Sequence, residues 1–366
     1  MNRRQFILNL SRYGFSVGLL SALPIKTFAK ERFLNRVMPI IDAHAHPLSF
    51  YRHQPNPTEH TFEMIREAGI VATSIAAVGD YANYSPDPGD SPYEDTLRQL
   101  TIVKEWEDEG YIEIIRRPQQ IRRRLAPEDP IGAILTIEGG DALEGNIDHL
   151  NEFYEMGVRI ITLVHKDNNE IGNDMRQFAS DDPEDSGLTD FGYDVVARMN
   201  ALGILIDVAH ASTQTVFDIA ESTKAPVIDS HTNPLPPFVL DRGPSRLRTY
   251  PEIEAIVETG GLLCTWPLAY SGTYPRETFE DWVQEIQEFE NHFSIRHIAL
   301  GTDGGGGLPN YIEGWNDIND LNLLEAAMLS EGFRKRKISA FLYHNLLRVL
   351  RRCFVVSRVL KRKKKV

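Results

Sequence analysis

The chain has 366 residues, of which 42% are apolar and 25% charged, so it can bury the core of one large domain or two average ones. Its formal net charge is −13 at pH 7, which argues against nucleic acid as the main partner. Its apolar runs are all shorter than the roughly 18 residues that span a bilayer, so no transmembrane helix is expected.

The N-terminal segment has the features of an export signal. Residues 1–29 combine a basic start, an apolar middle and small residues before a candidate cleavage site after Ala29. Arg3 and Arg4 resemble the paired arginines of the bacterial twin-arginine signal. We therefore predict a signal peptide over residues 1–29, export by the twin-arginine machinery and a periplasmic or secreted product. Ordinary secretion and a retained helix are the alternatives.

From residue 38 onward, short apolar runs alternate with segments of helical period, the pattern of repeated β-α units. The predicted strands cover residues 38–43, 70–77, 111–115, 131–137, 158–164, 204–208, 226–229, 261–266 and 297–302. The predicted helices cover residues 60–68, 93–109, 146–156, 189–202, 212–222, 250–259, 277–292 and 317–331.

This alternation predicts an α/β fold, a (β/α)₈ barrel of the TIM type. Nine strands are predicted, one more than such a barrel needs. We expect the strand over 111–115 to be the supernumerary one, because a polar segment follows it. We expect a single barrel domain over residues 30–350, with its active site at the C-terminal ends of the strands.

The end of the chain is strongly basic, with six Lys and Arg side chains within residues 358–366. We assign residues 351–366 as a basic C-terminal tail, solvated and disordered, with contact to an anionic surface as the alternative. Cys353 lies in this stretch and Cys264 in an apolar run. The two could pair in an oxidising compartment, and their spacing fits no metal site.

Six residues that can bind metals or transfer protons each follow or close a predicted strand. They are His44, His46, Glu138, His210, His231 and Asp303. Catalytic groups of (β/α)₈ barrels gather at the carboxyl ends of the parallel strands. Each residue taken alone has a structural explanation, but six structural residues would not all fall at the ends of predicted strands by chance. The chain is therefore interpreted as a metal-dependent hydrolase.

The spacing suggests two ions. His44 and His46 are separated by one residue, so on an extended segment their imidazoles point to the same side and can share one ion. Glu138 can bridge two ions through its two oxygens. His210 and His231 would complete the shell of the second ion, with Asp303 near the first. This ligand set favours zinc, with manganese, cobalt and iron as alternatives.

The chemistry expected from this arrangement is hydrolysis. Two ions about 3.5–4 Å apart would share a bridging hydroxide, and one ion would polarise the scissile carbonyl. Asp303 would take the hydroxide proton and deliver it to the leaving amine. His165 also ends a predicted strand, and we expect it to face the substrate and stabilise the oxyanion, with a structural role as the alternative.

These motifs resemble the membrane (renal) dipeptidase family of binuclear zinc peptidases over about residues 38–350. Seven segments carry the resemblance in order and spacing: IDAHAHP, IEGGD, GVRIITLVHKDNN, GLTDFGYDVVARMNALGILIDVAHAS, APVIDSHT, LGTDGG and HNLLRVL. The resemblance implies hydrolysis of dipeptides, including those with a C-terminal D-residue. It also implies a basic residue that binds the substrate carboxylate. Arg248 stands at the corresponding place, with Arg242 and Arg246 as competitors.

Two positions depart from the family pattern. His46 stands where the family has Asp, which gives a His-x-His pair and one less negative charge at the first ion. Gly304, Gly305 and Gly306 follow Asp303 where the family has Phe-Asp-Gly. The His-x-His pair favours an alternative function, a related amidohydrolase acting on lactones, cyclic amides or N-acyl amino acids. A catalytically inactive metal-binding protein is a third hypothesis. The sequence leaves the oligomeric state open, a homodimer included.

Overall fold

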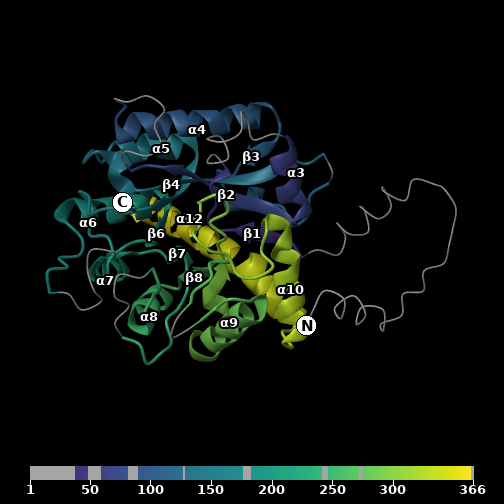
Figure 1. Ribbon diagram of the computed structural model, residues 1–366. Helices are drawn as coiled ribbons and strands as arrows, with labels where there is room; N and C mark the ends of the chain where they lie inside the picture. Colours follow the sequence, from purple (N-terminus) through teal and green to yellow (C-terminus); the bar gives the residue numbers. More distant parts are fainter. Residues whose placement is uncertain are drawn as a thin grey trace, which may run out of the picture. The chain divides into compact units, whose positions relative to one another are not determined.

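Eight short parallel strands follow one another in chain order around a barrel, as the sequence predicts (Figure 1). The computed structural model describes residues 38–47, 59–80, 90–126, 128–175, 183–240, 246–271 and 275–363. The strands are β1 (Ile40–Asp42), β2 (Ile70–Val78), β4 (Ile131–Glu138), β5 (Val158–Thr162), β6 (Leu205–Asp207), β7 (Val227–Thr232), β8 (Leu262–Thr265) and β9 (Ile298–Leu300). The predicted signal peptide over residues 1–29 lies outside the described residues.

The first and last strands meet, which nearly closes the barrel. The backbone N–H of Ala43 donates to the carbonyl of Leu300 at 3.0 Å. β3 (Ile112–Ile114) pairs only with β4 and lies outside the path of the other eight strands. The prediction that this strand is supernumerary is therefore confirmed.

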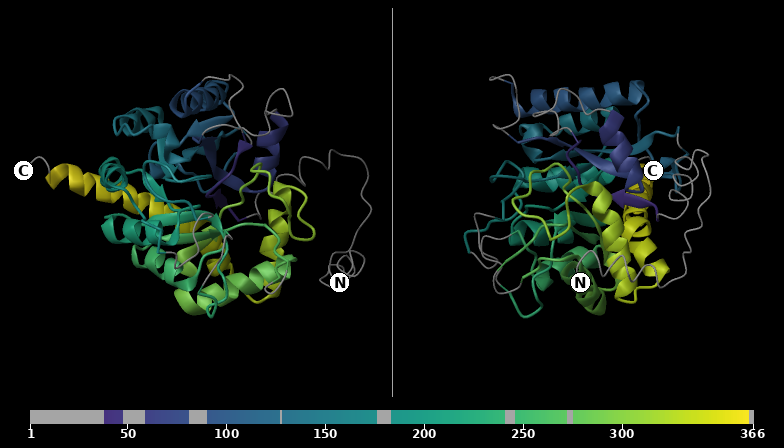
Figure 2. Two further views of the ribbon diagram at one scale, coloured as in Figure 1. Left: turned by 60° about the vertical axis from the view of Figure 1, so that its left-hand side comes forward. Right: turned by 45° about the vertical axis from the view of Figure 1, so that its right-hand side comes forward.

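The strands form where the sequence is continuously apolar. Every residue of β2 and β4 is buried, because parallel strands covered on both faces need apolar side chains on both. Helices surround the barrel in Figures 1 and 2. They are α3 (Glu59–Glu67), α4 (Pro92–Asp108), α5 (His149–Met156), α6 (Asp190–Leu202), α7 (Thr213–Ser222), α8 (Tyr250–Glu258), α9 (Phe279–Phe293), α10 (Leu321–Ser330), α11 (Lys335–Ser339) and α12 (Asn345–Lys363).

Glycines end two of these helices directly before a strand. Gly157 follows α5 with φ 114°, and Gly203 follows α6 with φ 90°. This left-handed conformation is readily accessible to glycine, so the chain can turn at once from helix into strand.

The end of the chain differs from the sequence prediction. Residues 351–363 are not a solvated tail but continue α12, on which Cys353 and Val356 are buried. They pack in a core cluster with Leu205 and Leu262, the first residues of β6 and β8. α12 therefore closes the end of the barrel at which the strands begin. Cys353 and Cys264 are both free, so the pairing left open by the sequence does not occur in this structure.

Among the described helices, none combines the length and the apolar character that a membrane-crossing helix needs.

Candidate metal centre

The six residues singled out at strand ends come together at the carboxyl edge of the barrel. Glu138 is the last residue of β4, and His231 lies inside β7. His210 and Asp303 each follow the end of a strand by three residues, β6 and β9 respectively. His44 and His46 follow β1. All six side chains belong to buried residues.

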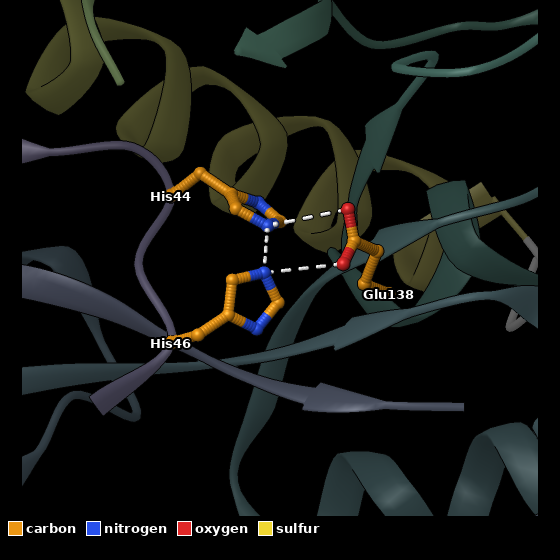
Figure 3. A group of neighbouring side chains, drawn as sticks. All are labelled: His44, His46 and Glu138. Atoms are coloured by element: carbon orange, nitrogen blue, oxygen red, sulfur yellow. Dashed lines mark hydrogen bonds and ion pairs between the residues drawn. The ribbon is translucent and has the colours of Figure 1, made fainter. Parts of the chain in front are cut away.

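Glu138 lies among four of these imidazoles, and Figure 3 shows it with two of them, His44 and His46. Its Oε1 is 3.4 Å from Nε2 of His44, 3.1 Å from Nε2 of His210 and 3.4 Å from Nε2 of His231. Its Oε2 is 3.2 Å from Nε2 of His46. Oε1 therefore contacts three imidazoles and Oε2 a fourth, so both oxygens of this carboxylate lie among candidate ligands and it can bridge two ions.

The imidazole nitrogens are spaced as ligands of a shared cation would be. Nε2 of His44 and Nε2 of His46 are 3.0 Å apart, and Nε2 of His210 and Nε2 of His231 are 3.2 Å apart. Two nitrogens on one tetrahedral zinc, each about 2.0–2.1 Å from it, would be separated by about 3.3 Å. The donor set and its spacing therefore fit divalent ions.

Asp303 adds a carboxylate to the His46 side of the cluster. Its Oδ1 lies 3.3 Å from Nε2 of His46 and, among the described residues, is buried without a hydrogen-bond partner. Gly306 makes room for this carboxylate, since a Cβ there would lie 2.1 Å from Oδ1 of Asp303. An unsatisfied buried carboxylate oxygen is costly unless a cation or a proton donor completes it.

One hydroxyl orients two of the histidines. Ser230 Oγ donates to Asp207 at 2.6 Å, and it lies 3.2 Å from Nδ1 of His44 and 2.8 Å from Nδ1 of His231. Because the hydroxyl proton goes to Asp207, its lone pairs can accept N–H groups from both Nδ1 atoms. This assigns the proton of each imidazole to Nδ1 and leaves both Nε2 atoms free for a metal ion.

The electrostatics favour the metal-binding forms of His210, His231 and Glu138. Burial lowers the pKa of His210 and His231, and the charge of Arg246 lowers both further. Burial would raise the pKa of Glu138, but His165, His44 and His46 outweigh it and hold that pKa well below its usual value. Burial opposes protonation of His46, yet Glu138 and Asp303 raise its pKa well above the ordinary value. That side of the cluster therefore attracts positive charge.

His165 lies at the edge of the cluster, 12% exposed, with Nε2 3.7 Å from Oε2 of Glu138. Its Nδ1 is 2.9 Å from Oδ1 of Asp80, a buried carboxylate two residues after the end of β2. The sequence analysis missed Asp80. Asp80 could have been found in the same way as the six cluster residues, because Gly79 and Asp80 also follow a predicted strand.

Arg248, the first choice for the carboxylate-binding residue, is fully buried and engaged elsewhere. Its guanidinium pairs with Asp229 at 2.6 Å and with Glu252 at 3.0 Å. It also donates to the carbonyls of Ala211 and Val208. These contacts tie α8 to the barrel and leave no group that points to a substrate.

Arg246 instead borders the cluster. Its Nη1 lies 2.7 Å from Nε2 of His210, and its Nη2 donates to the carbonyl of His231 at 3.0 Å. Its Nε is buried and has no hydrogen-bond partner among the described residues. Arg242, the third candidate, lies outside the described residues. The structure therefore places Arg246, not Arg248, beside the site.

Comparisons with known proteins identify the family and the fold of the chain. The chain matches the membrane dipeptidase family (peptidase family M19) over residues 28–364. Dipeptidase tcpJ of Claviceps purpurea (strain 20.1) is 28% identical over 265 residues, 70% of this chain and 59% of that protein. The matched part of the chain thus spans about 59% of the length of this relative.

Solved structures share the fold at low sequence identity. The probable dipeptidase PvdM from Pseudomonas aeruginosa superposes with a TM-score of 0.74 at 18% identity, covering 92% of this chain and 100% of that one. A metallopeptidase from Rhodobacter sphaeroides, solved with a phosphinate mimic of the dipeptide L-Ala-D-Ala, gives 0.72 at 19%, covering 86% and 99%. The family match over most of the chain, together with the barrel, leads to one conclusion: the chain belongs to the membrane dipeptidase family.

Proposed function

We propose that this protein is an exported dipeptidase that uses two divalent ions, with zinc as the first choice. The observation that carries this proposal is the central position of Glu138, whose Oε1 faces His210 and His231 while its Oε2 faces His46. In the proposed arrangement His44, His46 and Asp303 hold one ion, and His210 and His231 hold the other. Bound ions would supply the attacking hydroxide and polarise the scissile carbonyl.

Asp303 and His165 are proposed to handle the proton and the developing charge. Oδ1 of Asp303 has no hydrogen-bond partner among the described residues, so it can accept a proton from the nucleophile and return it to the leaving amine. His165 borders the cluster, and in its doubly protonated form, with Nδ1–H donated to Asp80, it can donate a hydrogen bond from Nε2 to the oxyanion. One such donor contributes about 3–4 kcal/mol to catalysis.

Arg246 is proposed to bind the free carboxylate of the dipeptide. Its buried guanidinium borders the His210 side of the cluster, and burial lowers its pKa despite the surrounding carboxylates. A buried cation with an unsatisfied N–H favours an anionic partner, and an arginine can bind a carboxylate through two parallel hydrogen bonds. The phosphinate bound to the Rhodobacter metallopeptidase mimics a dipeptide with a C-terminal D-alanine, which supports including such substrates.

Export remains part of the proposal through Arg3 and Arg4 in the N-terminal segment. The mature protein would lie in the periplasm or outside the cell. We expect the double variant Arg3→Lys/Arg4→Lys to accumulate as unprocessed precursor in the cytoplasm. A variant that is exported and processed like the unaltered chain would contradict the twin-arginine assignment.

The His-x-His pair favours one competing function, hydrolysis of lactones, cyclic amides or N-acyl amino acids. His46 Nε2 lies 3.2 Å from Glu138, so this imidazole is part of the cluster and not a bystander. A panel of L-L and L-D dipeptides, lactones and N-acyl amino acids, assayed with the metal-loaded protein, separates the two functions. We expect turnover of dipeptides. Turnover of lactones or acyl amino acids alone would contradict the dipeptidase assignment.

A further inference from the structure

The second half of α12 presents a strongly basic face to solvent. Besides Lys361, its exposed cations are Arg351, Arg352, Arg358, Arg362 and Lys363. Residues 345–366 contain nine Lys and Arg and no Asp or Glu, in a chain whose formal net charge is −13. Positive charge is thus concentrated on one helix of an acidic protein. We call these five cations, with the valines described next, the α12 basic face.

Two apolar side chains lie within this face. Val355 and Val359 are 46% and 47% exposed. With 3.6 residues per turn, Val355 lies about 40° around the helix from Arg351 and about 20° from Arg362. The valines are therefore flanked by guanidinium groups, while Cys353 on the other side of the helix is buried in the barrel core.

The cations of the α12 basic face are not used to hold the fold together. Within the part of the chain that the structure describes, none of them forms an ion pair; the nearby Lys361 lies over the ring of Tyr154 and is not counted among them. Cations in the last turn stabilise the C-terminus of a helix. That effect does not reach Arg351 and Arg352, which precede Lys363 by about three turns.

The position of the face leaves the metal centre accessible. Leu350 and Cys353 of α12 pack with residues at the starts of the strands, whereas the metal cluster lies at their carboxyl ends. In the left view of Figure 2, α12 runs outward from the barrel to the marked C-terminus. A partner bound to this face would therefore not cover the site of hydrolysis.

We infer that the α12 basic face docks the protein onto a bilayer that contains anionic phospholipid. The guanidinium groups bind lipid phosphates, and the valines enter the boundary between headgroups and acyl chains. Each cation near such a surface contributes about a fivefold gain in affinity, weakened by salt. A nucleic acid would attract the same cations but would gain nothing from the exposed valines.

Sedimentation with vesicles tests this inference on the purified full chain. We expect binding to vesicles of phosphatidylglycerol and phosphatidylcholine, weakening with salt, and no binding to phosphatidylcholine alone. The triple variant Arg351→Gln/Arg358→Gln/Arg362→Gln should lose roughly 100-fold in affinity. The double variant Val355→Ser/Val359→Ser should lose about tenfold, because it removes apolar surface from the contact. All these side chains are exposed, so the unfolding temperature should not change.

A matched variant removes the same charge from another helix. Arg334→Gln/Lys335→Gln/Arg336→Gln on α11 should keep the affinity within about threefold. Equal losses in the α11 and α12 variants would overturn the inference, as would equal binding to neutral vesicles or no binding to either kind. Two results together would assign the face to a polyanion and not to a bilayer. The valine variant would bind the vesicles as tightly as the unaltered chain, and duplex DNA would compete with the vesicles for the protein.

Discussion

Two residues of the metal centre have backbone conformations that side-chain-bearing residues rarely adopt. His210 has φ 67° and Asp303 has φ 51°. Each such residue costs about 1–3 kcal/mol and persists only where the surroundings enforce it. Each lies three residues after a barrel strand, where the left-handed turn aims the side chain at Glu138 or His46. Two of the four described non-glycine residues with positive φ thus belong to the centre.

We expect the side chain of Asp80 to contribute to catalysis although it is not a metal ligand. Its Oδ1 is 2.9 Å from Nδ1 of His165, so it accepts the Nδ1–H, orients the ring and stabilises the imidazolium form, which also carries an N–H at Nε2. We expect Asp80→Asn to lower kcat by roughly 10- to 100-fold through loss of that orientation, with metal content and KM unchanged. Steady-state kinetics with elemental analysis of the same sample measures both. An unchanged kcat would remove His165 from the proposed mechanism.

Arg246 should act on substrate binding. We expect Arg246→Ala to raise KM for dipeptides by roughly 10- to 100-fold, because a charge-assisted contact to the carboxylate is lost. Arg246→Lys should recover only part of that loss, since lysine cannot form the paired contact. A dipeptide amide, which lacks the carboxylate, should be hydrolysed alike by both variants and the unaltered chain.

The neighbouring arginine provides the control. Arg248→Met removes a buried partner of Asp229 and Glu252, and we expect it to lower the free energy of unfolding by about 3–5 kcal/mol. It should leave KM unchanged in protein that remains folded. An increase in KM for Arg248→Met, with none for Arg246→Ala, would reverse the assignment of the two residues.

At the scale of elements, α12 is part of the barrel domain rather than an appendage. Truncation after Leu350 would remove the buried Cys353 and Val356 and expose the residues that they cover. Burial of two such side chains stabilises by about 3 kcal/mol or more, so we expect a clearly lower urea midpoint. Truncation after Lys363 is the control and should leave the midpoint unchanged. Equal midpoints for the two truncations would restore the interpretation of residues 351–366 as a tail.

The elements also show what the sequence can and cannot predict. The strands follow from continuous apolar runs, and the residues that close these runs converge because parallel strands end at one edge. The sequence order does not show which of Arg246 and Arg248 points toward the metal centre. Arg248 precedes Glu252 by four residues, a spacing that favours a helical ion pair and could have marked it as structural. The helix over 351–363 was not predicted because the segment is rich in Lys and Arg, which suggested a solvated tail although Cys353 and Val356 are buried.

For the whole molecule, we expect metal binding to raise the free energy of unfolding. The cluster joins residues from five strands or their ends, so ions bind the folded chain and not the unfolded one. One ion at 100 times its dissociation constant stabilises by about 2.7 kcal/mol. We expect chelation to lower the unfolding temperature by about 5 °C and readdition of zinc to restore it. Unfolding temperatures that are insensitive to both treatments would argue against a metal centre.

The central claim is that Glu138 bridges two ions at the carboxyl edge of the barrel, and metal analysis of Glu138→Gln tests it most directly. The protein and the variant would be loaded with zinc, desalted and measured by elemental analysis against protein concentration. The bridging arrangement predicts about two ions per unaltered chain and one or fewer in the variant, because both shells share this carboxylate. The same stoichiometry in both proteins would contradict it.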